Sequence, residues 1–155
     1  MQKLNRIMGI LLFGLSLFLL SCGSSPEDIC SNEKVINDIG FKFFIQEYFW
    51  LGANYVKKDF GLSSEDLSKI ENLEKEYKQG KISDEQVRKQ ITEILKDKIS
   101  LKKIVDSTQD NKHKNHYFCS AVIQIGDKKY LVDYKVIYAG DNNYVVEVKN
   151  TKEVH

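Results

Sequence analysis

Two histidines stand three residues apart, His113 and His116, within a stretch that is rich in Lys and Asn. Their spacing could bring two imidazole rings to one metal ion, since zinc sites in proteins use His, Cys and carboxylate ligands. No Cys or acidic residue stands directly beside either histidine, so a third ligand would have to come from elsewhere in the chain. The sequence therefore favours a solvated loop here and predicts no metal site.

Glu47 is the one carboxylate with strongly apolar neighbours in the sequence, because the stretch from Phe41 to Trp50 contains six aromatic residues. A carboxyl buried among them would have a raised pKa and could act as an acid in a pocket. The sequence favours a plainer interpretation, in which Glu47 belongs to the polar edge that a helix of a globular domain normally turns toward solvent.

No recognised catalytic motif accompanies these residues. The sequence has no Gly-rich phosphate loop, no Gly-x-Ser-x-Gly and no His-Glu-x-x-His. Without Lys3 and Arg6 the chain has 21 basic residues against 22 acidic ones, so its net charge is close to zero. Nucleic-acid binding requires a basic face or stripe instead. We therefore predict no catalytic residue, no enzymatic activity, no cofactor and no nucleic-acid partner.

The N-terminal segment has the layout of a secretory signal. Lys3 and Arg6 are the only charges before Glu27, and the stretch 7–20 is apolar except for one serine. A membrane-spanning helix needs about twenty apolar residues, so this stretch is short for a span. A single-span anchor stays open as the alternative.

The four residues 19–22, Leu-Leu-Ser-Cys, resemble the lipobox of bacterial lipoproteins. In that family the cysteine thiol is diacylated, the signal peptide is cut before the cysteine, and the new amine is usually acylated too. The resemblance implies a signal peptide over 1–21 and acyl chains such as palmitate on Cys22. It also implies an extracytoplasmic domain anchored to the cell membrane or outer membrane, since two acyl chains anchor stably. The alternative is a chance cysteine after an ordinary signal.

The two remaining cysteines, Cys30 and Cys119, form an even pair in a compartment that permits disulfides. We predict that they are bonded, with two separate buried thiols as the alternative. The residues 22–29 then form a short lipidated tether, which holds the domain within about 30 Å of the bilayer. The residues 30–155 are expected to form one domain with a single core.

Hydrophobic spacing predicts helices in the first half of this domain, over 31–55, 63–80 and 83–95. Ser83 and Gln86 match a capping box at the start of the third helix. The second half changes to alternating apolar and polar residues with tight turns between the runs, which is typical of an antiparallel meander. The sequence thus predicts an α+β fold, in which a long aromatic helix and a helical hairpin pack on three or four strands.

This order of elements resembles cystatin-like and NTF2-like folds, and the segment 117–148 is similar to small uncharacterised bacterial and prophage lipoproteins. A pocket between the aromatic helix and the curled sheet is one expectation for such a domain. Its possible lining residues are Phe44, Glu47, Tyr48, Trp50, Tyr130, Tyr134 and Tyr138.

Three functions remain open, because fold alone does not assign one. The leading hypothesis is a non-enzymatic interaction module for a protein or envelope partner near the bilayer, with an exposed apolar sheet face at Leu131, Ile137 and Val145. The second is the small-ligand or lipid pocket described above. The third is an enzyme of NTF2-like type that uses Glu47 or a His–Asp pair. By analogy with prophage lipoproteins of this size, exclusion of a second phage is a further possibility.

Overall fold

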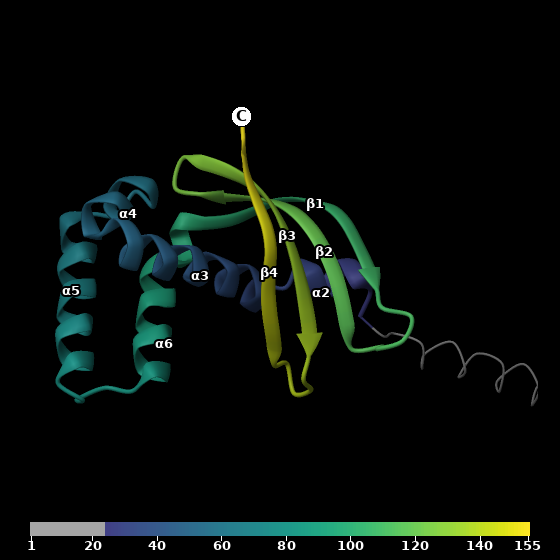
Figure 1. Ribbon diagram of the computed structural model, residues 1–155, viewed down its shortest axis with the longest axis horizontal. Helices are drawn as coiled ribbons and strands as arrows, with labels where there is room; N and C mark the ends of the chain where they lie inside the picture. The colour runs from purple at the N-terminus through teal and green to yellow at the C-terminus, as the bar shows by residue number, and fades with distance from the viewer. Residues whose placement is uncertain (1–23) are drawn as a thin grey trace, which may run out of the picture.

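The computed structural model describes residues 24–155, and this part of the chain forms an α+β domain (Figure 1). Helices come first, and an antiparallel sheet follows with strand order β1-β2-β3-β4. This confirms the predicted fold class. The elements are α2 (Pro26–Cys30), α3 (Glu33–Leu51), α4 (Ala53–Asp59), α5 (Ser64–Lys78), α6 (Asp84–Leu95), the 3₁₀ turn η1 (Lys96–Lys98), β1 (Ile99–Gln109), β2 (His116–Ile125), β3 (Lys128–Tyr138) and β4 (Tyr144–Val154).

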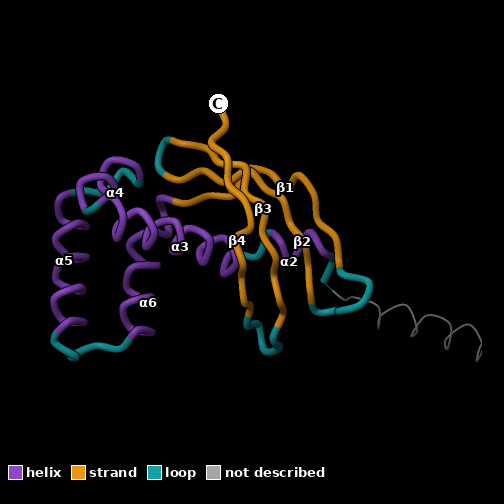
Figure 2. Tube along the Cα trace, in the orientation of Figure 1, coloured by secondary structure: helices purple, strands orange, loops and turns teal. Residues whose placement is uncertain are grey.

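Helix α3 connects two parts of the molecule (Figure 2). The four strands form one part, and the antiparallel pair α5 and α6 projects on the other side, with α3 running between them. Helix α3 contacts β1 and β4 of the sheet as well as α6 of the hairpin. The C-terminal end of α3 therefore lies beside the hairpin, away from the small helix α2.

A glycine allows α3 to approach strand β1 closely. A Cβ atom added at Gly40 would lie 1.9 Å from Cδ1 and 2.8 Å from Cγ1 of Ile99, which is buried in the core. No side chain larger than hydrogen fits there without movement of Ile99. The absence of a side chain at residue 40 thus sets the distance between the helix and the sheet.

The long aromatic helix ends earlier than the sequence predicted. The expected helix over 31–55 is divided at Gly52, which has φ of 92° and separates α3 from α4. The N–H of Gly52 donates to the carbonyls of Glu47 and Tyr48, which closes the last turn of α3. The prediction was wrong here because apolar spacing continues through Tyr55, whereas the positive φ of Gly52 stops the helix.

The helical hairpin follows the prediction closely. Ser83 and Gln86 form the predicted capping box of α6, and Ser63 with Asp66 forms another at the start of α5. In each box the serine hydroxyl accepts a backbone N–H, and the later side chain accepts the N–H of the serine. These caps fix the two helix starts, and α3 is capped in turn by the side chain of Asn32.

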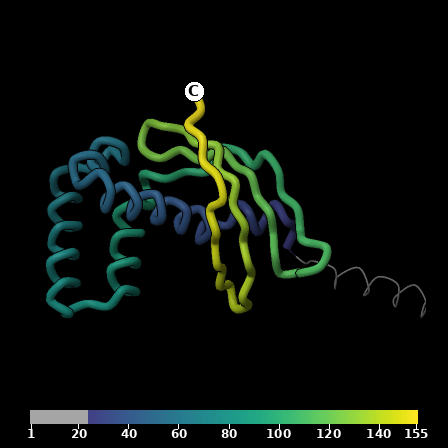
Figure 3. Tube along the Cα trace, viewed as in Figure 1, coloured from purple at the N-terminus to yellow at the C-terminus, as the bar shows by residue number. Residues whose placement is uncertain are grey.

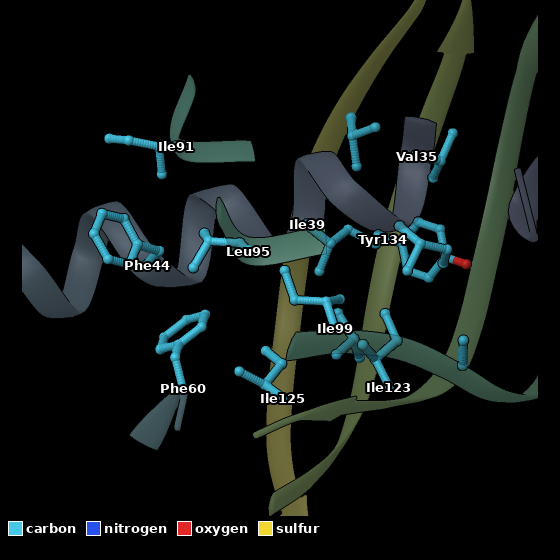
Figure 4. Packing of buried hydrophobic residues seen from close by; sticks show 14 of the residues in the cluster. Val35, Ile39, Phe44, Phe60, Ile91, Leu95, Ile99, Ile123, Ile125 and Tyr134 are labelled. Carbon is cyan, nitrogen blue, oxygen red and sulfur yellow. The ribbon is translucent and has the colours of Figure 1, made fainter. Parts of the chain in front are cut away.

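The core lies between α3, the hairpin and the inner face of the sheet (Figure 4). Ile39 from α3, Ile123 from β2 and Leu95 from α6 are almost entirely buried. Phe44 and Phe60 meet edge to face, with ring centroids 5.7 Å apart. This single cluster joins helices and sheet into one domain.

Cys30 and Cys119 form a disulfide, as predicted, with their Cα atoms 5.7 Å apart. Cys30 is the last residue of α2 and Cys119 lies in β2, so the bond fastens α2 to the sheet. The hydroxyl of Tyr134 donates to the backbone carbonyl of Cys30 at 2.6 Å and adds a second attachment. Figure 3 shows α2, in purple, beside the first two strands.

The predicted signal peptide over 1–21 and the predicted lipid site Cys22 lie outside the described residues. Helix α2 starts at Pro26, within the stretch 22–29 that the sequence analysis assigned to the tether, and its Ile29 is buried in the core. The folded part thus includes residues that precede the predicted start at Cys30. Within the described chain no helix combines the length and the apolar character required to cross a membrane.

Candidate binding site at the C-terminal end of helix α3

Four large apolar side chains are exposed where α3 ends and α4 begins, on more than one side of α3. Phe49 and Trp50 expose 73% and 83% of their surfaces, and they are followed by Leu51 at 53% and Tyr55 at 56%. Single exposed apolar residues are ordinary on protein surfaces, but contiguous groups mark interaction sites. We refer to Phe49, Trp50, Leu51 and Tyr55 as the aromatic tip.

An apolar groove adjoins the aromatic tip, between α3 and the helical hairpin. Its volume is about 220 Å³, and Phe49 belongs both to the tip and to the groove wall. Helix α3 forms one wall, and Ile70, Val87 and Ile91 from the hairpin form the other. The groove therefore exists only because the hairpin is held at a fixed distance from α3.

Two polar contacts hold the hairpin against α3. Tyr48 donates its hydroxyl to the Glu74 carboxylate on α5 at 2.5 Å. Arg88 on α6 forms an ion pair with Asp38, which is the buried charged residue of α3, and its guanidinium lies over the Phe41 ring. One contact involves α5 and the other α6, so each helix of the hairpin is held against α3 by a hydrogen bond to a charged group.

The charged residues that line the groove are both carboxylates, Glu74 and Asp84. A hydrogen bond from Lys78 lowers the pKa of Glu74, and the Tyr48 hydroxyl lowers it further. Burial raises the pKa of Tyr48, with a further contribution from its bond to Glu74, so the phenol stays protonated. A hydrogen bond to Asp84 likewise raises the pKa of Tyr77. The groove thus combines apolar walls with negative charge.

Glu47 lies on the opposite side of α3, under Trp50 and Tyr130, in a second hollow of about 330 Å³. Its Oε2 atom is buried and has no hydrogen-bond partner among the described residues. Burial, and after it the neighbouring Asp59 carboxylate, raise the pKa of Glu47 to about 7. Asp59 is itself paired with Lys128 at 3.3 Å. The sequence-based preference for a solvated Glu47 is therefore corrected, because its carboxyl is partly desolvated beside a second carboxylate.

The predicted pocket lining does not converge on one cavity. Phe44 is buried and stacks on Tyr48 at 5.6 Å, and together they line the groove. Trp50 and Tyr130 line the second hollow with Glu47. Tyr134 lies in the core, where its hydroxyl donates a hydrogen bond to the backbone carbonyl of Cys30.

Tyr138 lies at the end of β3, where it packs against Tyr144 with ring centroids 5.5 Å apart. The three tyrosines predicted to line a pocket, Tyr130, Tyr134 and Tyr138, thus lie in the second hollow, in the core and at the strand end. The outer sheet face behaves partly as predicted, since Val145 is exposed while Leu131 and Ile137 are half-buried.

The sequence analysis missed the contribution of the hairpin to the groove. Val87 and Ile91 belong to the helix predicted over 83–95 and Tyr77 to the helix predicted over 63–80, and neither helix was expected to border a pocket. The usable signal was Tyr77, because a tyrosine near the charged end of a helix suits the margin of a binding site. Its ring is 45% exposed in the structure and lines the groove.

His113 lies in the loop between β1 and β2, and His116 is the first residue of β2; their rings stack with centroids 4.8 Å apart. The structure brings Asp110 to them, with its Oδ2 atom 3.5 Å from Nδ1 of His113. The sequence analysis passed over Asp110 because it does not adjoin either histidine along the chain. The loop is solvated, as the sequence favoured, and it contains a third candidate ligand.

No family model matches the chain, and comparisons with curated proteins and with solved structures likewise found no match. Any functional assignment must therefore rest on the geometry of these residues.

Proposed function

We propose that this chain is a membrane-anchored lipoprotein of the bacterial cell envelope, and that it binds a partner protein through the aromatic tip and the adjoining groove. The occupant of the groove is an amphipathic helix with an apolar face and flanking basic residues. The proposal is for a non-enzymatic interaction module on the extracytoplasmic side of the membrane.

The observation that carries the proposal is the continuity of Phe49 between the exposed tip and the groove wall. A groove with one open, aromatic end fits the helix-in-groove mode of recognition, in which spaced apolar anchors enter a hydrophobic channel. Trp and Tyr are also the residues that most often supply binding energy at interfaces. Trp50 and Tyr55 are exposed at the same end of α3 as Phe49, with Trp50 on the side of the helix that faces the second hollow.

Charge favours a protein over the bilayer as the occupant. The charged groups on the groove wall are the carboxylates of Glu74 and Asp84, and Glu74 is paired with Lys78. Anionic phospholipid headgroups would be repelled by them, whereas basic side chains on a partner helix would be attracted. The partner is thus expected to carry Lys or Arg beside its apolar anchors.

The proposed anchor lies at the other end of α3. If Cys22 is acylated, only the three residues 23–25 separate it from α2, a span of about 10 Å when extended. Helix α3 has 19 residues, which corresponds to a length of about 28 Å. The tip would therefore be available to a second envelope protein while α2 remains close to the bilayer.

The test uses in-cell photo-crosslinking from two positions. A photoreactive amino acid replaces Trp50 in one variant and Glu76, an exposed residue of α5, in the other. We expect position 50 alone to crosslink one envelope protein, through a segment with the predicted amphipathic pattern. Crosslinking of phospholipid from position 50 would contradict a protein partner. The same products from both positions would contradict binding at the tip.

A binding measurement completes the test. Trp50 is the single tryptophan of the chain, so its fluorescence reports directly on the tip when the crosslinked segment is added as a peptide. We expect Phe49→Ser to weaken binding about tenfold or more, as removal of an aromatic anchor does. The matched control Lys89→Ser changes an exposed residue of α6 that is not on the groove wall, and should leave affinity unchanged. Equal affinity for both variants would overturn the assignment of the site.

A further inference from the structure

We propose that Asp110, His113 and His116 form a binding site for a divalent late transition-metal ion, with Zn²⁺ as its typical occupant. Asp110 and His113 lie in the loop between β1 and β2, and His116 is the first residue of β2, at the opposite end of the domain from the aromatic tip (Figure 1). This metal site shares no residue with the groove and does not depend on the proposed partner.

The three residues already place their ligand atoms together. One carboxylate oxygen of Asp110 and one ring nitrogen from each histidine all lie within 4.8 Å of one another. Ligand bonds to zinc measure about 2.0–2.2 Å, so two ligands of a tetrahedral ion lie about 3.3 Å apart. Oδ2 of Asp110 and Nδ1 of His113 already lie 3.5 Å apart, and the His113 side chain, with 60% of its surface accessible, can adjust its rotamer to an ion.

The backbone of the loop is held in place by its own hydrogen bonds. The N–H of Asp110 donates to the carbonyl of His116, and the N–H of His116 donates to the carbonyl of His113, each at 2.9 Å. Asn115 exchanges two hydrogen bonds with the backbone of Tyr138, which attaches the loop to the end of β3. The ligands are therefore presented by a fixed turn, which lowers the entropic cost of binding an ion.

The two carboxylate oxygens of Asp110 have different roles. Oδ1 accepts the backbone N–H of Lys112 at 2.7 Å and that of His113 at 3.3 Å, which orients the carboxylate. Oδ2 faces Nδ1 of His113. Support of a ligating carboxylate by such hydrogen bonds is a regular feature of metal sites. Asp110 is thus oriented by the loop and can bind through its second oxygen.

The donor set selects the class of ion. Two imidazoles and one carboxylate suit zinc and its late first-row neighbours, whereas calcium and magnesium prefer sites made only of oxygen ligands. Three protein ligands leave a fourth position for water or for a ligand from another molecule. The thiols of Cys30 and Cys119 do not compete for the ion, because they are joined in the disulfide.

Metal titration of the full chain, as the producing cell processes it and in mild detergent, tests the site. Calorimetry with Zn²⁺ is expected to show one equivalent bound. His113→Gln and His116→Gln should each weaken binding at least about tenfold, since even mutation of residues that only hydrogen-bond to the ligands weakens metal binding that much. The matched control is His155→Gln, which alters the third histidine of the chain, outside the loop.

A second readout separates loss of a ligand from loss of the fold. Cu²⁺ replaces Zn²⁺, and electron paramagnetic resonance is expected to show coupling to two imidazole nitrogens in the unaltered protein and to one in His113→Gln. His113 is exposed, so thermal unfolding without metal should be unchanged in that variant. Absence of Zn²⁺ binding, or equal affinity in His113→Gln and His155→Gln, would overturn the proposal.

Discussion

Tyr48 on α3 and Glu74 on α5 are joined by a 2.5 Å hydrogen bond that spans the groove beside the aromatic tip. The phenol donates and the carboxylate accepts, so the bond involves a charged partner and is stronger than one between neutral groups. It connects the longest helix of the described chain to α5, while α6 packs against α3 on the other side of the hairpin. The shape of the proposed binding site depends on this pair.

Tyr48→Phe removes the hydroxyl and keeps the ring. We expect a loss of about 1–2 kcal/mol in unfolding free energy, because the hydrogen bond to a charged group disappears while Glu74 keeps its partner Lys78. Hydrogen exchange should become faster in α5 while the strands remain protected. Tyr55→Phe is the control, since Tyr55 is exposed and should show neither effect.

Cys119→Ser breaks the disulfide, which links residues 89 positions apart. Loop-closure entropy gives a loss of about 4–5 kcal/mol as an upper estimate, and chemical denaturation measures it. Cys30→Ser should cost about the same, and the double variant little more, because either change removes the same bond. Unchanged unfolding midpoints in both single variants would show that the bond contributes no stability.

Gly40→Ala tests the close approach of α3 to the sheet. Alanine is the better helix former by about 1 kcal/mol, yet its Cβ would overlap the buried side chain of Ile99. We expect net destabilisation of about 1–3 kcal/mol, as in other overpacked cores. Ile99→Ala removes both overlapping atoms, so the two changes together should cost clearly less than the sum of their separate costs. Strict additivity would contradict the contact.

Glu47→Gln tests the partly desolvated carboxyl. The pKa of Glu47 is about 7 in the folded protein and 4.5 when unperturbed, so the folded state holds the proton more tightly. Its contribution to stability is therefore present at low pH and is lost as the pH rises from about 4.5 to 7.

The variant carries a neutral amide at every pH. We expect it to be more stable than the parent by about 1 kcal/mol at pH 8, after allowance for solvent screening, and to differ little at pH 5. Thermal unfolding at the two values measures the difference. Glu65→Gln alters an exposed carboxylate and serves as the control. A gain of equal size at both pH values would show that ionisation of Glu47 is not its cause.

The local part of the fold was predictable, because capping and periodicity are read from neighbouring residues. Ser83 with Gln86 marked a helix start, and alternating residues marked the strands. The break at Gly52 was not predicted, since the aromatic spacing continues past it and the positive φ of one glycine leaves no periodic signal. The pairing of Cys30 with Cys119 was predicted by elimination among three cysteines and is present.

The candidate sites depended on tertiary placement that sequence spacing does not contain. Tyr134 and Tyr130 have the same alternation along β3, but one enters the core and the other borders the second hollow. The groove arises from the position of the hairpin against α3, which the pairs Tyr48–Glu74 and Arg88–Asp38 determine. Asp110 was missed because it approaches His113 only after the loop has turned.

Native mass spectrometry of the protein extracted from its own membranes in mild detergent tests the central claim most directly. The account predicts a chain that begins at Cys22, carries acyl chains there, lacks the hydrogens lost to the disulfide, and retains one companion protein that Phe49→Ser releases. An uncut and unacylated chain would contradict the lipoprotein assignment. A processed chain whose companion is retained equally by Phe49→Ser would contradict the proposed role of the aromatic tip.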